Sequence, residues 1–353
     1  VKVYVTANIL AHNSDLTDAA AYFTELADLH PDALIIADPG LFMIAKDVCP
    51  EIDIHISTQA NNCNYGTFLF WHEQGASRVV TARELSLKEI GEIRKRIPAD
   101  MEIETFVHGA MCISYSGRCL LSAYMTGRSA NEGACTHPCR WKYAVVEEKR
   151  PGEYFPVEEN ERGTYIFNSK DMCMIEHIPD LFEAGIDSFK IEGRMKSVHY
   201  CATVAKVYRT AIDTYLKEGK DWYVRPEWIA ELEKISHRPY TDGFAEGRPD
   251  ETAQNYGKST NTQSHDFIGL VLGYNEEEKY VDLEQRNNFK VGDKVEFCQP
   301  KGELVETVIE KMTDEDGNPI DVAPHAQMKV RIYMDTPLEP YSMMRRECKP
   351  KAE

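Results

Sequence analysis

Short apolar runs and amphipathic stretches alternate along the first two thirds of the chain. The apolar runs predict strands, and stretches with hydrophobic residues three or four positions apart predict helices. Strands are predicted at residues 2–6, 33–37, 52–56, 78–81, 102–107 and 188–191. Helices are predicted at 16–29, 41–48, 61–73, 87–97, 171–183 and 198–216, with Ser86 as the N-cap of the fourth. This alternation is typical of a parallel sheet wrapped by helices.

A polar or charged residue follows each predicted strand. These residues are Asn8, Asp38, Gln59, Arg83, His108 and Glu192. In a (β/α)8 barrel the carboxyl ends of all strands open onto one mouth, which favours a TIM-like barrel over a doubly wound sheet. A closed barrel needs eight strand–helix units and we count six. We therefore expect a barrel that lacks its first two units, and the absence of an initiator Met fits this expectation.

The rest of the chain departs from this alternation. Residues 108–164 interrupt it as an insertion that is rich in cysteine, with short strands predicted at 143–148 and 164–167. Residues 220–265 are predicted as a linker region with one helix at 226–235. From residue 266 to 348, short strands separated by Gly, Asn and Asp turns predict a small all-β barrel. The barrel-like catalytic domain is thus expected at 1–219.

The overall charge excludes one class of partner but leaves a local exception. With 58 acidic and 40 basic residues, the net charge is −18, which argues against nonspecific nucleic-acid binding over the whole surface. Between residues 108 and 145, however, only Glu132 opposes four cations. These cations, which could meet RNA phosphates, are Arg118, Arg128, Arg140 and Lys142.

The cysteines give the strongest chemical signal. Four lie within the insertion, namely Cys112, Cys119, Cys135 and Cys139, and Cys173 follows at the predicted start of a helix. With no export signal and no apolar run long enough for a membrane span, ten cysteines predict a cytoplasmic protein with free or metal-bound thiols and no membrane partner. The spacing lacks the CxxC pairs of zinc sites, whereas iron–sulfur ligation tolerates irregular spacing. The alternative is that they are small buried core residues.

Several motifs resemble the collagenase-like peptidase family U32. The resemblance lies in ETFVHGAMCISYSGRCLLS, YMTGR, CTHPCRWKY, FNSKDMC and FKIEGRMKS, and it extends over essentially the whole chain. It implies a (β/α)8-like barrel whose first quarter is absent here, followed by the C-terminal β-barrel. Better understood relatives are oxygen-independent hydroxylases of tRNA, ribosomal RNA or ubiquinone precursors. This chain is most similar to the subgroup that hydroxylates wobble uridine in tRNA with prephenate.

The resemblance also implies a cofactor and partners. It implies a 4Fe–4S cluster (four iron, four sulfur), and carrying the ligands over by position gives Cys112, Cys119, Cys135 and Cys173, with Cys139 as the rival. It implies tRNA and prephenate as substrates, and a second protein of the same family is a candidate partner.

Residues at the predicted strand ends are candidates for substrate binding and catalysis. Prephenate carries two carboxylates, which arginine binds through two parallel hydrogen bonds. The candidate substrate ligands are Gln59, Arg83, Lys190, Glu192 and Arg194. In the alternative interpretation, Arg83 and Arg194 form ordinary ion pairs with Glu84 and Glu192. His55 and His108 are candidates for proton transfer near neutral pH, although a lone histidine is more often structural.

Three functions remain open at the level of sequence. The first is an iron–sulfur hydroxylase that acts on uridine in tRNA. The second is a peptidase, for which Cys112 with His108 is the attractive nucleophile–base pair, since HExxH and GxSxG motifs are absent. The third is an RNA-binding module that works through the C-terminal β-barrel, although residues 266–348 show no clear row of basic and aromatic residues.

Overall fold

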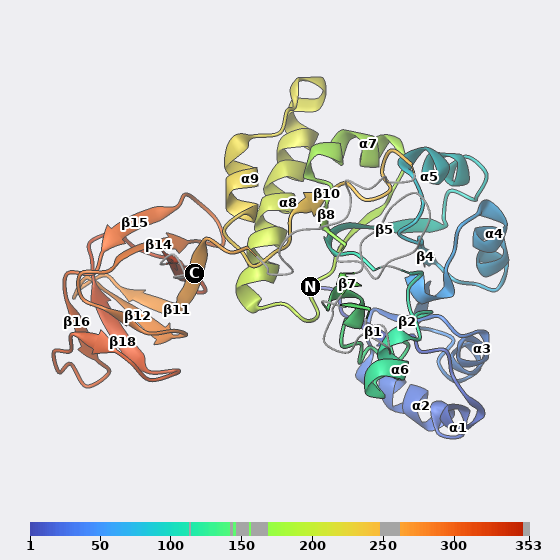
Figure 1. The fold of residues 1–353 in the computed structure, drawn as a ribbon, viewed down its shortest axis with the longest axis horizontal. Helices are drawn as coiled ribbons and strands as arrows, with labels where there is room; N and C mark the ends of the chain where they lie inside the picture. The colour runs from blue at the N-terminus through green and yellow to red at the C-terminus, as the bar shows by residue number, and fades with distance from the viewer. Residues whose placement is uncertain (113, 142–143, 146–154, 157–168, 248–261, 349–353) are drawn as a thin grey trace. The chain divides into compact units, whose positions relative to one another are not determined.

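The chain folds into two compact units that each combine segments distant in sequence. The computed structural model describes residues 1–112, 114–141, 144–145, 155–156, 169–247 and 262–348 (Figure 1). The first unit comprises Val1–Glu192 and Pro239–Thr260, and the second comprises Gly193–Arg238 and Asn261–Glu353. The second unit thus takes up helices that the sequence assigned to the barrel domain and the linker. The domain boundaries at residues 219 and 265 stay predictions.

All six strands predicted for the parallel sheet are present in the first unit. They are β1 (Tyr4–Ala7), β2 (Ala33–Ile36), β3 (Asp53–Ile56), β4 (Arg78–Val80), β5 (Glu102–Ala110) and β9 (Ser188–Ile191). Each pairs in parallel with the next, in chain order. A doubly wound sheet would reverse this order at a switch point, and the six parallel strands show no such reversal. In the described pairing β1 and β9 are the two ends of this run, and closure into an eight-stranded ring stays a prediction.

Helices cover the outer side of this sheet (Figure 1). They are α1 (Asn13–Leu16), α2 (Ala19–Leu29), α3 (Pro39–Val48), α4 (Tyr65–Glu73) and α5 (Leu87–Arg94). Side chains set where they begin: Asp38 accepts hydrogen bonds from the backbone N–H groups of Gly40 and Leu41. Ser86 and Glu89 form a capping box at α5, which confirms the predicted N-cap. The helix predicted over 16–29 is interrupted after Leu16 and resumes at Ala19.

The helix predicted over 171–183 is wrong in its first part. Residues Asp171–Cys173 form strand β8, which pairs antiparallel with β5 and parallel with β10 (Tyr240–Thr241). The helical segment begins later, with η3 (Ile175–His177) and α7 (Ile178–Glu183). The reason is tertiary: β4 pairs with β5 only up to Glu104, so the end of β5 offers unpaired backbone groups that β8 satisfies. Cys173 therefore lies in a strand, and the sheet is not wholly parallel.

The described part of the insertion contains little regular structure. It comprises α6 (Leu121–Thr126), η2 (Pro138–Arg140) and a two-stranded ladder of β6 (Ala144–Val145) and β7 (Phe155–Pro156). The predicted strand at 143–148 is described only at β6, and that at 164–167 lies outside the described residues.

The second unit joins helices to an antiparallel sheet. Its helices are α8 (Val198–Glu218), η4 (Gly219–Asp221) and α9 (Pro226–Leu232). The sheet runs in the order β15 (Val305–Val308), β14 (Lys294–Cys298), β19 (Met343–Glu347), β11 (His265–Asn275), β12 (Tyr280–Gln285), β18 (Lys329–Tyr333) and β16 (Met312–Asp314), with β13 (Phe289–Lys290) paired to β17 (Val322–Ala323). Val271, Leu283, Phe297 and Met344 lie in its core. This confirms the predicted all-β segment as an antiparallel sheet.

None of the helices in the described ranges is long and apolar enough to cross a membrane.

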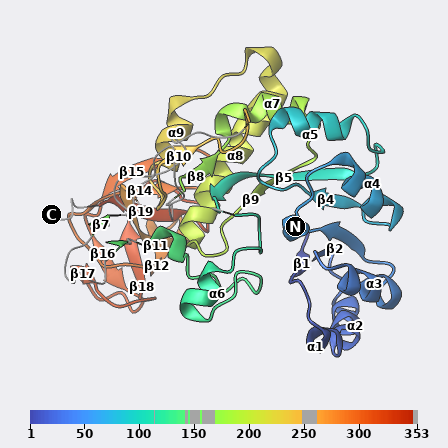
Figure 2. The same ribbon diagram turned by 45° about the vertical axis from the view of Figure 1, so that its right-hand side comes forward.

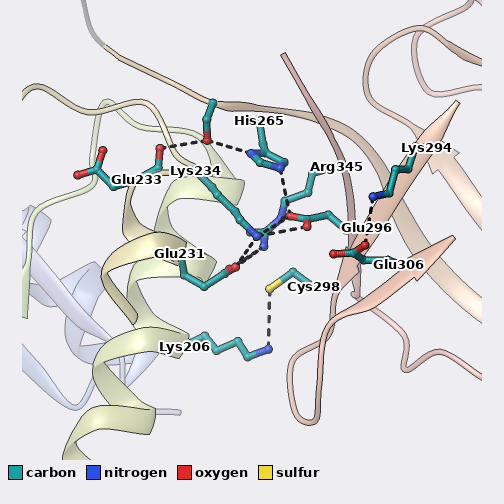
Figure 3. Close-up of polar contacts among 11 residues, drawn as sticks. Lys206, Glu231, Glu233, Lys234, His265, Lys294, Glu296, Cys298, Glu306 and Arg345 are labelled. Atoms are coloured by element: carbon teal, nitrogen blue, oxygen red, sulfur yellow. Dashed lines mark hydrogen bonds and ion pairs between the residues drawn. The ribbon is translucent and has the colours of Figure 1, made fainter. Parts of the chain in front are cut away.

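A buried ion network ties α9 to the antiparallel sheet within the second unit (Figure 3). Arg345 of β19 is fully buried and donates to both carboxylate oxygens of Glu231 on α9, at 2.8 and 2.6 Å, and also to Glu296 of β14. Lys234 contacts both carboxylates, with Nζ 2.7 Å from Glu231 and 3.0 Å from Glu296. Because removal of one partner would leave uncompensated buried charge, this network fixes the packing of α9 on the sheet.

Candidate active site at the carboxyl ends of the parallel strands

An asparagine of the insertion is seated against the ends of β1 and β3. The Asn131 side chain accepts a hydrogen bond from the backbone N–H of Leu10 at 2.8 Å and donates to the Leu10 carbonyl at 3.1 Å. Gln59, directly after β3 in η1 (Thr58–Ala60), donates to the Asn131 backbone carbonyl at 3.4 Å and accepts from Asn8 at 3.3 Å. The predicted substrate ligand Gln59 is therefore held between the sheet and the insertion. Sequence reasoning missed Asn131, because one asparagine in a loop gives no signal of a distant partner.

The thiols of the insertion lie within electrostatic range of one another. Burial raises the pKa of the Cys139 thiol, and although Arg140 opposes this, the charges of Cys112, Cys135 and Cys119 raise the pKa further. Arg140 donates to the backbone carbonyl of Met111 at 3.0 Å, which joins the two ends of the segment. The insertion thus gathers soft sulfur donors, the kind that iron–sulfur clusters require.

The positions of these thiols do not by themselves select four ligands. In the described ranges, no three Cys, His, Asp or Glu side chains are arranged to hold one metal ion. Cys173 lies opposite His108 in the pairing of β8 with β5, so it reaches this end of the sheet from a different element. The ligand set stays a prediction, with Cys139 as the rival of Cys135 or Cys173 for the third or fourth place.

Arg83, immediately beyond β4, has the best geometry for an anionic ligand. Its Cζ atom lies 3.9 Å from the centroid of the Phe106 ring, and its Nη2 lies 4.0 Å from Oε2 of Glu192. Burial lowers the pKa of Arg83, while the charges of Glu192 and Cys112 oppose that shift. Arginine stays charged even so, because its reference pKa is above about 12. The result is a nearly buried cation, 13% exposed, beside the thiol segment.

A pocket opens next to this arginine. The cavity itself is small, about 20 Å³, which is little more than a single water molecule needs. Its wall is mainly apolar, with a few polar side chains, and is formed by Thr81, Arg83, Thr105, Phe106, Met172, Met174, Asp242 and Phe244 among others. Arg83 and Asp242 are its charged lining residues, so the pocket presents a cation beside apolar side chains but has no room for a whole ligand in this conformation.

Lys190 is already engaged inside the first unit. Its Nζ donates to Glu104 at 2.6 Å, and Glu104 also accepts from Arg78 at 3.0 Å and from Ser188 at 3.0 Å. Burial works to raise the pKa of Glu104, but Lys190, Ser188 and Arg78 together hold that pKa below its usual value. The polar cluster formed by Arg78, Glu104, Ser188 and Lys190 was not predicted from the sequence, since its members come from three strands. Lys190 therefore contributes to this cluster before any ligand binds.

The two histidines occupy different surroundings. His55 is buried beside Tyr4, with ring centroids 4.7 Å apart, and burial together with Arg78 lowers its pKa to about 4. Its imidazole is therefore neutral at pH 7, which does not suit a general acid. His108 is 1% exposed, and its ring lies 5.4 Å from that of Tyr240. Both are structural neighbours of the site, and their catalytic roles stay predictions.

Glu192 is held close to β5 because residue 109 is a glycine. Gly109 has a φ of +122°, and a Cβ atom there would lie 2.6 Å from the backbone oxygen of Glu192. The backbone N–H of Glu192 donates to the carbonyl of His108 at 2.9 Å. The glycine in the HGAMC stretch thus permits the close approach that brings Glu192 to Arg83. Arg194, the other predicted carboxylate ligand, belongs to the second unit.

Two of the predicted RNA-binding cations are available at the surface. Arg118 and Arg128 are exposed, and neither forms an ion pair within the described segments. Arg140 instead binds the Met111 carbonyl, and Lys142 lies outside the described residues.

Two protein-family models together match most of the chain. The model of Peptidase family U32 matches residues 1–255, and that of the Peptidase family U32 C-terminal domain matches residues 263–345. The tRNA hydroxylation protein P1 of Bacillus subtilis (strain 168) is 43% identical, covering 98% of this chain and 81% of the relative. The tRNA hydroxylation protein P of Escherichia coli (strain K12) is 40% identical, covering 92% and 79%. A crystal structure of the C-terminal domain of a U32 peptidase from Geobacillus thermoleovorans is 48% identical over 23% of this chain and 99% of that one, with a TM-score of 0.23.

Proposed function

This chain belongs to peptidase family U32, and on that premise we propose that it is an enzyme that hydroxylates a uridine in tRNA. The observation that carries the proposal is the similarity, over nearly the whole chain, to relatives named as tRNA hydroxylation proteins. The electropositive, thiol-rich insertion at the strand ends gives that reaction a location. Because the proposed substrate is tRNA, we propose that the reaction takes place in the cytoplasm.

We further propose that the insertion holds a 4Fe–4S cluster. Cys112, Cys119 and Cys135 would supply three ligands and Cys173 the fourth, with Cys139 as the alternative. A bound cluster would supply one-electron redox chemistry. The gathering of thiols around Cys139 supports this site. Arg83 interacts electrostatically with Cys112, and a nearby cation favours the thiolate form that binds metal.

Prephenate is the proposed co-substrate, and Arg83 is its proposed anchor. The 4.0 Å separation from Glu192 is longer than a hydrogen bond, so the guanidinium retains donors for a carboxylate. The contact with the Phe106 ring restricts the guanidinium, and the apolar side chains of Met172 and Phe244 line the small pocket beside it. Bidentate recognition of this kind is specific to arginine.

The peptidase alternative finds less support. A cysteine hydrolase needs a nucleophile beside a general base. Cys112 is solvent exposed, whereas the His108 ring is buried next to Tyr240. The family name therefore does not identify the chemistry of this site.

An anaerobic assay with purified protein tests the proposal. The protein, tRNA lacking the modification and prephenate are incubated with a reductant, and the nucleosides are then analysed by mass spectrometry. Hydroxyuridine that appears only with prephenate and without molecular oxygen supports the proposal. Hydrolysis of a peptide substrate that is abolished by Cys112→Ser, with no change in the tRNA, would contradict it.

A further inference from the structure

One face of α6 carries large apolar side chains that the first unit leaves uncovered. Leu120 and Tyr124, four residues apart and so on one side of the helix, are 78% and 87% exposed, and Met125 next to them is also exposed. We call Leu120, the N-cap of α6, and Tyr124 the α6 face; Met125 lies on the adjoining side of the helix. Figure 2 shows α6 clear of the helices that flank the sheet. Exposed apolar groups that cluster in this way indicate a binding surface.

The opposite side of α6 fixes this face beside the thiols. Ser122 is buried, and its hydroxyl accepts a hydrogen bond from the backbone N–H of Thr136 at 3.0 Å. Thr136 directly follows Cys135, and Leu120 directly follows Cys119. The α6 face is therefore attached on both sides to the segment that carries the proposed cluster ligands.

The charges around the α6 face identify the kind of partner. Arg118 and Arg128 bracket it in sequence, both exposed, and in the described residues neither has a carboxylate partner. Glu132 is the only acidic residue between 111 and 141, in a chain of net charge −18. Apolar and aromatic side chains can stack on unpaired bases, and the two arginines can bind the phosphates of the same strand. An apolar surface that binds another protein would not require these two cations.

Resting on the proposed function, we propose that the α6 face is a stacking platform for unpaired bases of the tRNA loop that contains the target uridine. Tyr124 would stack on a base next to the target, Leu120 would pack against it, and Arg118 and Arg128 would bind the phosphates on either side. Single-stranded bases are recognised through such aromatic stacking. The platform would hold the loop while the target base is turned toward the strand ends.

Binding measurements with matched variants test this proposal. Fluorescence anisotropy is measured with a labelled anticodon stem–loop and with a labelled, fully paired RNA duplex. Tyr124→Ala should weaken stem–loop binding about tenfold and leave duplex binding unchanged, because only unpaired bases stack. Tyr124→Trp should retain stem–loop binding. Arg128→Ala should weaken binding of both RNAs. As controls, Tyr341→Ala and Leu216→Ala, which change exposed residues of the second unit, should bind as wild type does.

The outcomes separate this inference from the proposed function. If wild type hydroxylates tRNA but Tyr124→Ala and Leu120→Ala bind the stem–loop normally, the platform is refuted and the function stands. If wild type binds no RNA, both fail. If the variants bind RNA normally but lose self-association in sedimentation experiments, the α6 face contacts a second copy of the chain and the inference is overturned.

Discussion

The guanidinium of Arg83 lies over the ring of Phe106, with Cζ 3.9 Å from the ring centroid. Arg83 follows β4 and Phe106 lies within β5, the neighbouring parallel strand, and the contact holds a nearly buried cation beside a small pocket. The ring restricts the arginine without consuming its hydrogen-bond donors.

Arg83→Lys should raise the KM for prephenate at least about tenfold, while the KM for tRNA changes little. Lysine keeps the charge but loses both the bidentate geometry and the planar stack on Phe106. Steady-state kinetics with prephenate as the varied substrate measures this effect. Arg96→Ala, an exposed arginine stacked on Tyr65 of α4, serves as the control. An unchanged KM for prephenate in Arg83→Lys would place the carboxylate elsewhere.

Gly109→Ala should destabilise the first unit by about 2 kcal/mol or more. Alanine would have to adopt a backbone conformation with positive φ, and its methyl group would overlap with neighbouring atoms. The new Cβ would lie 2.6 Å from the Glu192 oxygen, and alanine disfavours a φ of +122°. Chemical denaturation measures the loss. Gly91→Ala in α5 is the matched control, since the nearest atom to its Cβ is 3.8 Å away, and it should be neutral or stabilising. Equal stability of the two variants would contradict this account of Gly109.

Sequence patterns predicted the parallel strands well because each is a short apolar run buried by its neighbours. Ala33–Ile36, for example, is buried at all four residues. The patterns failed at Asp171–Cys173, where pairing with the end of β5 outweighs helical periodicity. They also could not reveal the hydrogen bond between Gln59 and Asn131, or those that Arg78 and Lys190 donate to Glu104. Contacts between polar residues distant in sequence leave no local signal. The cysteines and Arg83 could be proposed as site residues because residue type and position after a strand are both visible in sequence, and their roles stay predictions.

The stability of the second unit should fall as the pH is lowered from about 6.5 toward 4. Burial, reinforced by Arg345, lowers the pKa of His199 to about 4. In this pH range the unfolded chain therefore binds a proton at His199 that the folded chain does not. Above about pH 6.5, the pKa of histidine in the unfolded chain, the neutral state of His199 costs no stability. At pH 5 the free energy of unfolding is lower by an amount on the order of 2 kcal/mol.

Thermal or chemical unfolding at pH 5 and pH 7 measures this effect. His199→Gln should lose less stability between the two pH values than wild type does, whereas the exposed His325→Gln should behave as wild type. An identical pH dependence in wild type and His199→Gln would show that His199 is not buried in its neutral form.

Single Cys→Ser variants should divide the cysteines into two groups by iron content. Cys112→Ser, Cys119→Ser, Cys135→Ser and Cys173→Ser should lose iron after anaerobic purification, because each removes a thiolate ligand. Cys139→Ser should retain most of it, and Cys298→Ser, at a buried position in the second unit, is the control. Loss of iron in Cys139→Ser with retention in Cys173→Ser would reverse the choice between these two residues.

The most direct test of the central claim is nucleoside analysis of tRNA from cells in which the gene is deleted and no redundant pathway operates. The account predicts that hydroxyuridine disappears in the deletion strain. Wild type and Cys298→Ser should restore it, whereas Cys112→Ser should not. Unchanged hydroxyuridine in the deletion strain would contradict the proposed function, and full restoration by Cys112→Ser would contradict a role for the thiol-rich insertion in the chemistry.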